Sequence, residues 1–119
     1  MPDTRRHKVI YDTDPGVDDA MALYYALAHP AIEVLGLTTT FGNVHVGQAV
    51  TNALYLLQLA GRDIPVTQGA DRPLSKVVEV PPAHIHGADG LGNLGARLPA
   101  TRQADPRSSA QFIVDMARA

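Results

Sequence analysis

Four aspartates crowded into eight positions are the residues of this chain best suited to chemistry. They are Asp12, Asp14, Asp18 and Asp19. Two carboxylates about 6 Å apart repel each other by roughly 3 kcal/mol at an effective dielectric constant near 20. The dipole at a helix N-terminus offsets only about 0.3–1 kcal/mol for each carboxylate. The cluster therefore requires a cation, a shared proton or hydroxyl donors from a ligand.

The chemistry of these side chains indicates which cation would suit them. Carboxylate oxygens with no histidine or cysteine close in sequence favour the hard ions Ca²⁺ and Mg²⁺. Each aspartate alone also has an ordinary structural interpretation, Asp14 as an Asx-turn residue and Asp18 as a helix-start residue. A purely structural turn would not accumulate this mutual repulsion, so we interpret the four together as a ligand site.

The elements around this turn alternate in the order of a parallel α/β sheet. Apolar runs predict three strands, and the segments between them predict two helices. The strands are expected at residues 8–11, 32–39 and 64–68, and the helices at residues 17–28 and 46–60. Ligands of such sheets bind beyond the carboxyl ends of the strands, which is where the acidic turn must lie.

The second half of the chain is less regular. We expect an edge strand at residues 77–80, a long glycine-rich loop at residues 81–107 and a helix at residues 108–119 with Phe112, Ile113 and Met116 as its buried face. Long irregular segments in compact domains are typical of lids and binding loops. No capping residue ends the last helix and no strand follows it. We therefore expect residues 1–119 to be the N-terminal part of one larger domain, with no internal boundary.

Charge and composition exclude several classes of partner. The net charge is −2 and the ten Lys and Arg residues are scattered, so no basic stripe is available for nucleic acid. No apolar run approaches the roughly 18 residues that a membrane span needs, and the first residues do not form a signal peptide. The absence of cysteine excludes disulfides and thiolate chemistry. We expect a cytoplasmic protein with no nucleic-acid or membrane partner.

Two known acidic motifs are alternatives for the turn. An EF-hand loop fails, because Gly16 stands where the third oxygen ligand should be and no glutamate follows at the twelfth position. A Mg²⁺ phosphatase of the haloacid dehalogenase type is closer, since Asp-x-Asp after the first strand would supply a nucleophile and a general acid. That pattern continues with Gly-Thr or Gly-Val after the second aspartate, whereas Pro15 follows here.

Four sequence blocks together match one family pattern. They read Asp12-Thr13-Asp14-Pro15-Gly16-Val17-Asp18-Asp19, Thr38-Thr39-Thr40-Phe41-Gly42-Asn43, Gly69-Ala70-Asp71-Arg72-Pro73-Leu74 and His84-Ile85-His86-Gly87. In this order they resemble the nucleoside hydrolase family, the inosine-uridine type of N-ribohydrolase. The resemblance implies an open Rossmann-like parallel sheet with helices on both faces. It also implies hydrolysis of the N-glycosidic bond of a ribonucleoside to ribose and free base.

The resemblance further implies which residues hold the metal. Ca²⁺ would hold the attacking water, with Asp14 as a calcium ligand and as the general base that takes the water's proton. Asp19 would be the second calcium ligand. Asp12 would support the site from just behind it.

Substrate contacts are implied for three further residues, which are Asp18 and Asn43 toward the ribose hydroxyls and His86 on the nucleobase side. Without the resemblance, Gly42-Asn43 is an ordinary turn and a loop histidine is an ordinary solvated residue. The role of His84 stays open.

Other parts of that family's site come from later in the chain than residue 119. They include further calcium ligands, an asparagine on the ribose and often a histidine that acts as an acid toward the leaving base. We therefore expect the 119 residues alone to bind Ca²⁺ weakly and not to be competent for catalysis. The complete protein would be a dimer or tetramer, and its preference for purine or pyrimidine is not predicted. The alternative of a different class is a noncatalytic α/β module whose acidic turn binds a divalent ion.

Overall fold

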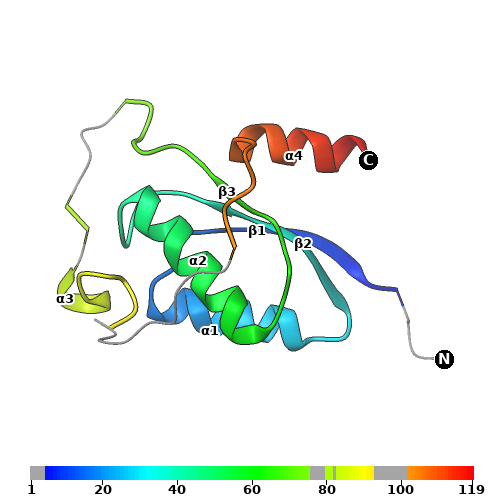
Figure 1. The fold of residues 1–119 in the computed structure, drawn as a ribbon, viewed down its shortest axis with the longest axis horizontal. Coiled ribbons are helices and arrows are strands. Elements are labelled where there is room, and N and C mark those ends of the chain that lie inside the picture. Colours follow the sequence, from blue (N-terminus) through cyan, green and yellow to red (C-terminus); the bar gives the residue numbers. More distant parts are fainter. Residues whose placement is uncertain (1–4, 76–79, 82, 93–101) are drawn as a thin grey trace.

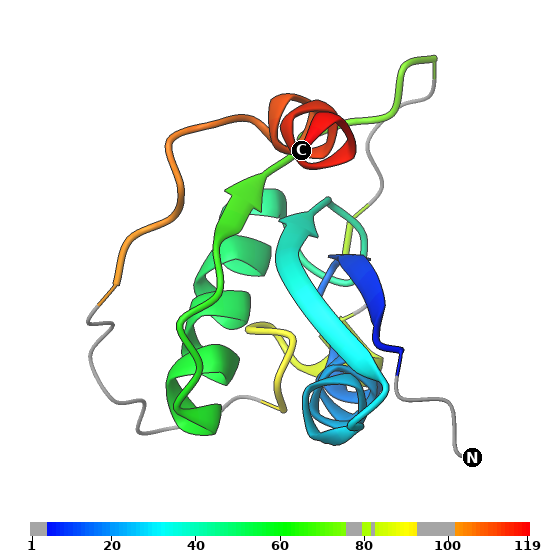
Figure 2. The same cartoon turned by 90° about the vertical axis from the view of Figure 1, so that its right-hand side faces the viewer.

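The computed structural model describes residues 5–75, 80–81, 83–92 and 102–119 (Figure 1). Its centre is a parallel three-stranded sheet in the order β1-β2-β3. The strands are β1 (His7–Thr13), β2 (Ile32–Thr39) and β3 (Val66–Gln68). The helices are α1 (Val17–Ala28), α2 (Val46–Ala60), α3 (Ala83–His86) and α4 (Ser109–Arg118). Helices α1 and α2 cover one face of the sheet and α4 covers the other, as Figures 1 and 2 show.

Local sequence signals set the helix ends. Helix α1 ends before Pro30, whose ring cannot continue a helix. Helix α2 ends at Gly61, which adopts the left-handed conformation with φ of 67°. Helix α4 is capped by Ser108, whose side chain accepts a hydrogen bond from the Gln111 N–H at 3.1 Å. The predicted helices at residues 17–28 and 46–60 are confirmed at both ends.

A buried apolar cluster joins α1 and α2 to the sheet. Its members are Leu23, Val34, Leu37, Val50, Ala53, Leu56, Leu57, Ile64 and Val66. Burial of these side chains is the main force that holds α1 and α2 against the strands. The turn at residues 14–16, which starts α1, is thereby fixed at the carboxyl edge of the sheet.

The opposite face is shaped by an irregularity in β2. Val9 pairs with Val34, but Ile10 pairs with Gly36, so the register shifts and Leu35 is the extra residue. Gly36 then faces the ring of Phe112, and a Cβ atom at this position would overlap that ring. Phe112 is fully buried.

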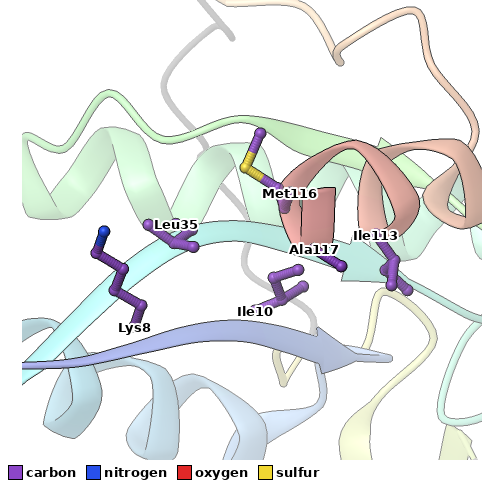
Figure 3. Close-up of a pocket in the computed structure, with 6 residues that line it drawn as sticks. All are labelled: Lys8, Ile10, Leu35, Ile113, Met116 and Ala117. Atoms are coloured by element: carbon purple, nitrogen blue, oxygen red, sulfur yellow. The ribbon is translucent and has the colours of Figure 1, made fainter. Parts of the chain in front are cut away.

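Beside this contact, an apolar groove of about 310 Å³ separates α4 from β1 and β2 (Figure 3). Its lining residues are Lys8, Ile10, Leu35, Ile113, Met116 and Ala117. Ile113 is 44% exposed, so its prediction as a buried residue of the last helix is wrong. The reason is that Ile113 lines this open groove and is not packed tightly against the strands.

The second half of the chain differs from expectation in one further respect. The short helix α3 lies in a segment that the sequence predicted as loop. The predicted edge strand at residues 77–80 lies, apart from Val80, outside the described residues. Within the part of the chain that the structure describes, no helix has both the length and the apolar character that a membrane span needs.

Candidate functional site

Asp12 lies inside β1, one residue before its end, and is held by the neighbouring strand. It pairs in register with Thr38, and the Thr38 hydroxyl donates to Asp12 Oδ1 at 2.6 Å. This hydrogen bond occupies one carboxylate oxygen of Asp12, and it lies between the two strands and not in the turn. Among the described residues, Asp12 makes no hydrogen bond to the other three aspartates.

Asn43 brings Asp14 and Asp19 together. Its backbone N–H donates to Asp14 Oδ2 at 2.7 Å. Its side-chain Nδ2 donates to the Asp14 backbone carbonyl at 3.1 Å and to Asp19 Oδ2 at 2.9 Å. Gly42, just before it, leaves room for this contact, because a Cβ atom there would overlap the Asp14 carboxylate. The carboxyl ends of β1 and β2 therefore meet at Asn43, as a parallel sheet requires.

Asp19 also closes the start of α1. The Gly16 N–H donates to Asp19 Oδ2 at 3.0 Å, which satisfies one of the unpaired amides of the first helical turn. The helix-start role considered for Asp18 from the sequence is therefore filled by Asp19. In the described part of the chain, Oδ1 of Asp14 and Oδ1 of Asp19 have no hydrogen-bond partner. The carboxylates of Asp14 and Asp19 therefore each have one oxygen available to a ligand.

His86 packs against the N-terminus of α1. Its Nδ1 accepts a hydrogen bond from the Val17 N–H at 3.1 Å, and its side chain is only 12% exposed. An accepting Nδ1 places the proton of the neutral ring on Nε2. A Cβ atom at Gly16 would lie 2.6 Å from this Nδ1 and 2.8 Å from Asn43 Nδ2, so only glycine lets both side chains approach the turn.

Asp18 is exposed to solvent beside His86. Its side chain is 83% exposed, and Oδ1 lies 4.0 Å from His86 Nδ1. Because that nitrogen accepts a hydrogen bond from Val17, the contact is not an ion pair. The structure therefore groups Asp14, Asp19 and Asn43 by direct hydrogen bonds, with His86 and Asp18 beside them. His84 belongs to α3, and its side chain lies outside what the structure describes.

Two residues near the site were not predicted from the sequence. Tyr11 lies on β1, and its hydroxyl is 3.4 Å from the Asp19 backbone carbonyl of α1. Burial, and then the negative charge of Asp19, raise the pKa of Tyr11 above its ordinary value, so this phenol stays protonated. Asn52 of α2 is fully buried and donates to the Pro15 carbonyl. The sequence pattern gave no signal for Asn52, because this residue lies off the apolar stripe that predicts the helix at residues 46–60.

The donor set fits part of a shell for a hard cation. Asp14 and Asp19 offer carboxylate oxygens, the donor type that Ca²⁺ and Mg²⁺ prefer. Ca²⁺ takes six to eight oxygens, so further ligands are needed. Among the described residues, no group of three or more His, Cys, Asp or Glu side chains is arranged to hold a metal ion.

Comparison with known proteins identifies the relatives of this chain. Residues 9–119 match the family of inosine-uridine preferring nucleoside hydrolases. The chain is 45% identical over 115 residues to probable uridine nucleosidase 2 of Arabidopsis thaliana, covering 95% of this chain and 35% of that protein. It is 37% identical over 110 residues to the inosine-uridine preferring nucleoside hydrolase of Leishmania major, covering 92% of this chain and 35% of that protein.

A solved structure agrees with the sequence matches. The purine-preferring ribonucleoside hydrolase from Gardnerella vaginalis superimposes with a TM-score of 0.88 at 39% identity, covering 94% of this chain and 36% of that one. The chain thus spans about a third of the length of the relatives it matches, which agrees with the prediction that it corresponds to part of their domain. The predicted parallel sheet with helices on both faces is confirmed, and nothing favours the phosphatase alternative. The chain belongs to the inosine-uridine preferring nucleoside hydrolase family.

Proposed function

We propose that the protein hydrolyses the N-glycosidic bond of ribonucleosides to ribose and a free base. The observation that carries the proposal is the set of hydrogen bonds by which Asn43 holds Asp14 and Asp19 together at the carboxyl edge of the sheet. Membership of the nucleoside hydrolase family supports the same reaction class. Loss of the base gives the ribose oxocarbenium character, and carboxylates fixed nearby stabilise that positive charge in the transition state.

Asp14 is proposed as the general base. The Asn43 N–H fixes its Oδ2 at 2.7 Å, and no hydrogen bond in the described residues occupies Oδ1. A carboxylate held by one oxygen presents the other in a defined direction, as proton transfer from an attacking water requires. Asp12, bonded to Thr38 in the strand below, is proposed to support the turn rather than to react.

Asp14 and Asp19 are also proposed to hold a divalent cation. Their carboxylate oxygens suit Ca²⁺, the ion that the resemblance to the family implies. Use of a metal ion is a property of the nucleoside hydrolase family. When bound, such an ion makes a neighbouring water more acidic and orients vicinal hydroxyls. The remaining ligands are proposed to come from the parts of the family domain that these 119 residues do not span.

Three side chains are proposed to contact the nucleoside. The exposed carboxylate of Asp18 can accept hydrogen bonds from ribose hydroxyls. Asn43 uses both amide hydrogens on Asp14 and Asp19, so it would meet a sugar hydroxyl through Oδ1 as an acceptor. His86 would present its Nε2 proton on the nucleobase side.

Base preference does not follow from these residues. The names of the relatives mention uridine, inosine-uridine and purine, although all share this part of the domain. A dimer or tetramer and a cytoplasmic location are further parts of the proposal. They are supported by the family resemblance and the composition, respectively.

A reducing-sugar assay on the natural full-length protein, loaded with Ca²⁺, tests the proposal. We expect release of ribose from inosine or uridine. Absence of release by a folded, Ca²⁺-loaded protein would overturn the enzymatic proposal. Ca²⁺ binding without release would instead favour the noncatalytic ion-binding module.

A further inference from the structure

Asn52 is a buried amide that joins three parts of the chain. Its exposed fraction is 0%. Its Nδ2 donates to the backbone carbonyl of Pro15 at 3.2 Å and to that of Asp89 at 2.7 Å. Its Oδ1 accepts from Gln48 Nε2 at 2.8 Å. Pro15 and Asp89 each lie 37 residues from Asn52 along the chain, one before it and one after it.

The Asp89 carbonyl belongs to a compact segment, residues 87–92, which we name the glycine loop. In Figure 2 this loop, in yellow, lies between α2 and α1. Gly90 is buried there with φ of 82°, and a Cβ atom on it would lie 3.0 Å from Asn52 Nδ2 and 3.0 Å from the Pro15 carbonyl oxygen. The same Cβ atom would lie 2.6 Å from Val44 Cγ1. The glycine loop, the acidic turn and α2 thus meet at Asn52.

The glycine loop in turn holds His86. The Gly92 N–H donates to the His86 backbone carbonyl at 2.8 Å, so the loop folds back on that residue. The His86 ring then accepts from the Val17 N–H at the start of α1. A displacement of the loop would therefore shift His86 relative to Asp14 and Asp19.

We propose that Asn52 is a positioning residue, which couples the glycine loop to the acidic turn and so sets the place of His86 beside the Asp14 and Asp19 carboxylates. The consequence for turnover rests on the proposed nucleoside hydrolysis. The structural coupling does not.

The chemistry of an amide explains why this residue type suits the position. The two carbonyls of Pro15 and Asp89 are acceptors only, and one NH₂ group supplies two donors. Leucine at position 52 would leave both carbonyls without this donor in a buried place. Aspartate would set a carboxylate against two carbonyl oxygens. Either change would loosen the loop and the turn together, because both depend on the same nitrogen.

Hydrogen exchange measured by mass spectrometry on the full-length protein tests the coupling. The variants are Asn52→Leu and Gly90→Ala, the second of which pushes the loop off Asn52 without altering α2. We expect exchange at least about tenfold faster in peptides that cover residues 15–18 and 86–92, since a lost buried hydrogen bond shifts local opening by that factor. The Val17 amide, which is bonded to His86, is the most direct reporter.

Leu57→Ala is the matched control, because Leu57 is fully buried on the same helix but belongs to the apolar cluster. It should lower the melting temperature without selective exchange in the two peptides. Faster exchange confined to these two peptides, in either Asn52→Leu or Gly90→Ala, supports the coupling. If one of the two variants does not fold, the other still decides the question. If hydrogen exchange in these two peptides is no faster in Asn52→Leu and Gly90→Ala than in Leu57→Ala, the proposed coupling is overturned.

Kinetics on the same proteins test the consequence for turnover. For Asn52→Leu we expect kcat for ribonucleoside hydrolysis to fall about tenfold or more well below its melting temperature. Leu57→Ala should keep kcat, because its defect is confined to stability. Equal kcat values in wild type and Asn52→Leu would overturn the positioning role. If the wild-type protein releases no ribose, the proposed function fails, while the exchange result still decides the coupling.

Discussion

Asn43 and Asp14 make two hydrogen bonds to each other across the carboxyl edge of the sheet. The Asn43 N–H reaches Asp14 Oδ2 at 2.7 Å, and its Nδ2 reaches the Asp14 backbone carbonyl at 3.1 Å. The first bond fixes the carboxylate and the second fixes the main chain that carries it. The turn after β1 is therefore oriented by the turn after β2, whichever ligand it binds.

Asn43→Ala separates these two contributions, because it keeps the backbone donor to Asp14 and removes both side-chain bonds. We expect Ca²⁺ affinity to fall about tenfold or more, as for other residues that orient metal ligands. Isothermal titration of the full-length protein with Ca²⁺ measures this. Gln103→Ala, at an exposed position, is the control and should bind as wild type does. Unchanged affinity in Asn43→Ala would show that the carboxylates keep their places without the amide.

Asp14→Asn tests the proposed general base. An amide cannot take a proton from water, so kcat should fall about 100-fold or more. The substitution keeps the size of the side chain, and far-UV circular dichroism should report an unchanged fold. Asp71→Asn is the control, since Asp71 is exposed and pairs only with Arg72 in the described structure. Near-normal turnover of Asp14→Asn would remove Asp14 from this role.

Thermal melting with added cations tests the proposed calcium site without any activity assay. A ligand at about 100 times its Kd stabilises the folded state by about 2.7 kcal/mol, so Ca²⁺ should raise the melting temperature of the full-length protein. EGTA should reverse the shift. Mg²⁺ should give a smaller one, because it requires a near-ideal octahedral shell.

Asp19→Asn provides the matching variant for this experiment. It removes one proposed ligand, and its melting temperature should respond less to Ca²⁺ than that of wild type. An equal response in both proteins, or a larger response to Mg²⁺, would contradict the assignment.

The helices and strands that position the site could be predicted because their signals are local. Pro15-Gly16 and Pro30 bound α1, and the continuous apolar run of residues 32–39 is typical of a buried parallel strand. The alternating order then requires the carboxyl ends of β1 and β2 to meet. This order places Asn43, which follows β2, beside the acidic turn, which follows β1.

Other features depend on contacts that the sequence pattern does not contain. The register shift at Leu35 depends on how β2 pairs with β1, and only that shift sets Gly36 under Phe112. The pairing of Asn52 with Pro15 and Asp89 depends on where the glycine loop folds. Residue type and spacing alone do not distinguish Asp12 from its three neighbours, and strand pairing is what gives it Thr38 as a hydrogen-bond partner.

The pH dependence of stability should show the ion pair between Asp105 and Arg107, just before α4. Arg107 donates to both carboxylate oxygens of Asp105, at 3.0 and 2.9 Å. These hydrogen bonds lower the pKa of Asp105 from 3.8 to about 2. Because the pKa is lower in the folded state, the pair stabilises the protein above about pH 4 and loses this effect as the pH falls toward 2.

Urea denaturation at several pH values measures this contribution. Asp105→Asn should be less stable than wild type at pH 7, and the difference should shrink as the pH falls from about 4 to about 2. A difference that is the same at pH 7 and pH 2 would assign the loss to packing instead of the carboxylate charge.

Gly36→Ala tests whether Phe112 fixes α4 on the sheet. The new methyl group would overlap the buried ring, and overpacking of this kind costs about 1–3 kcal/mol of unfolding free energy. Gly47→Ala is the matched control. Nothing lies within 4 Å of the Cβ position at Gly47, and alanine in a helix is favoured over glycine by about 0.5–1 kcal/mol.

A second substitution then identifies the clash. Phe112→Leu makes room for the methyl group, so the double variant with Gly36→Ala should lose less stability than the sum of the two single losses. Urea denaturation of the four proteins gives this coupling. Additive losses would mean that the ring does not stand over Gly36. Coupling would fix α4 to β2 at Gly36, two residues before Thr38, the threonine that holds Asp12.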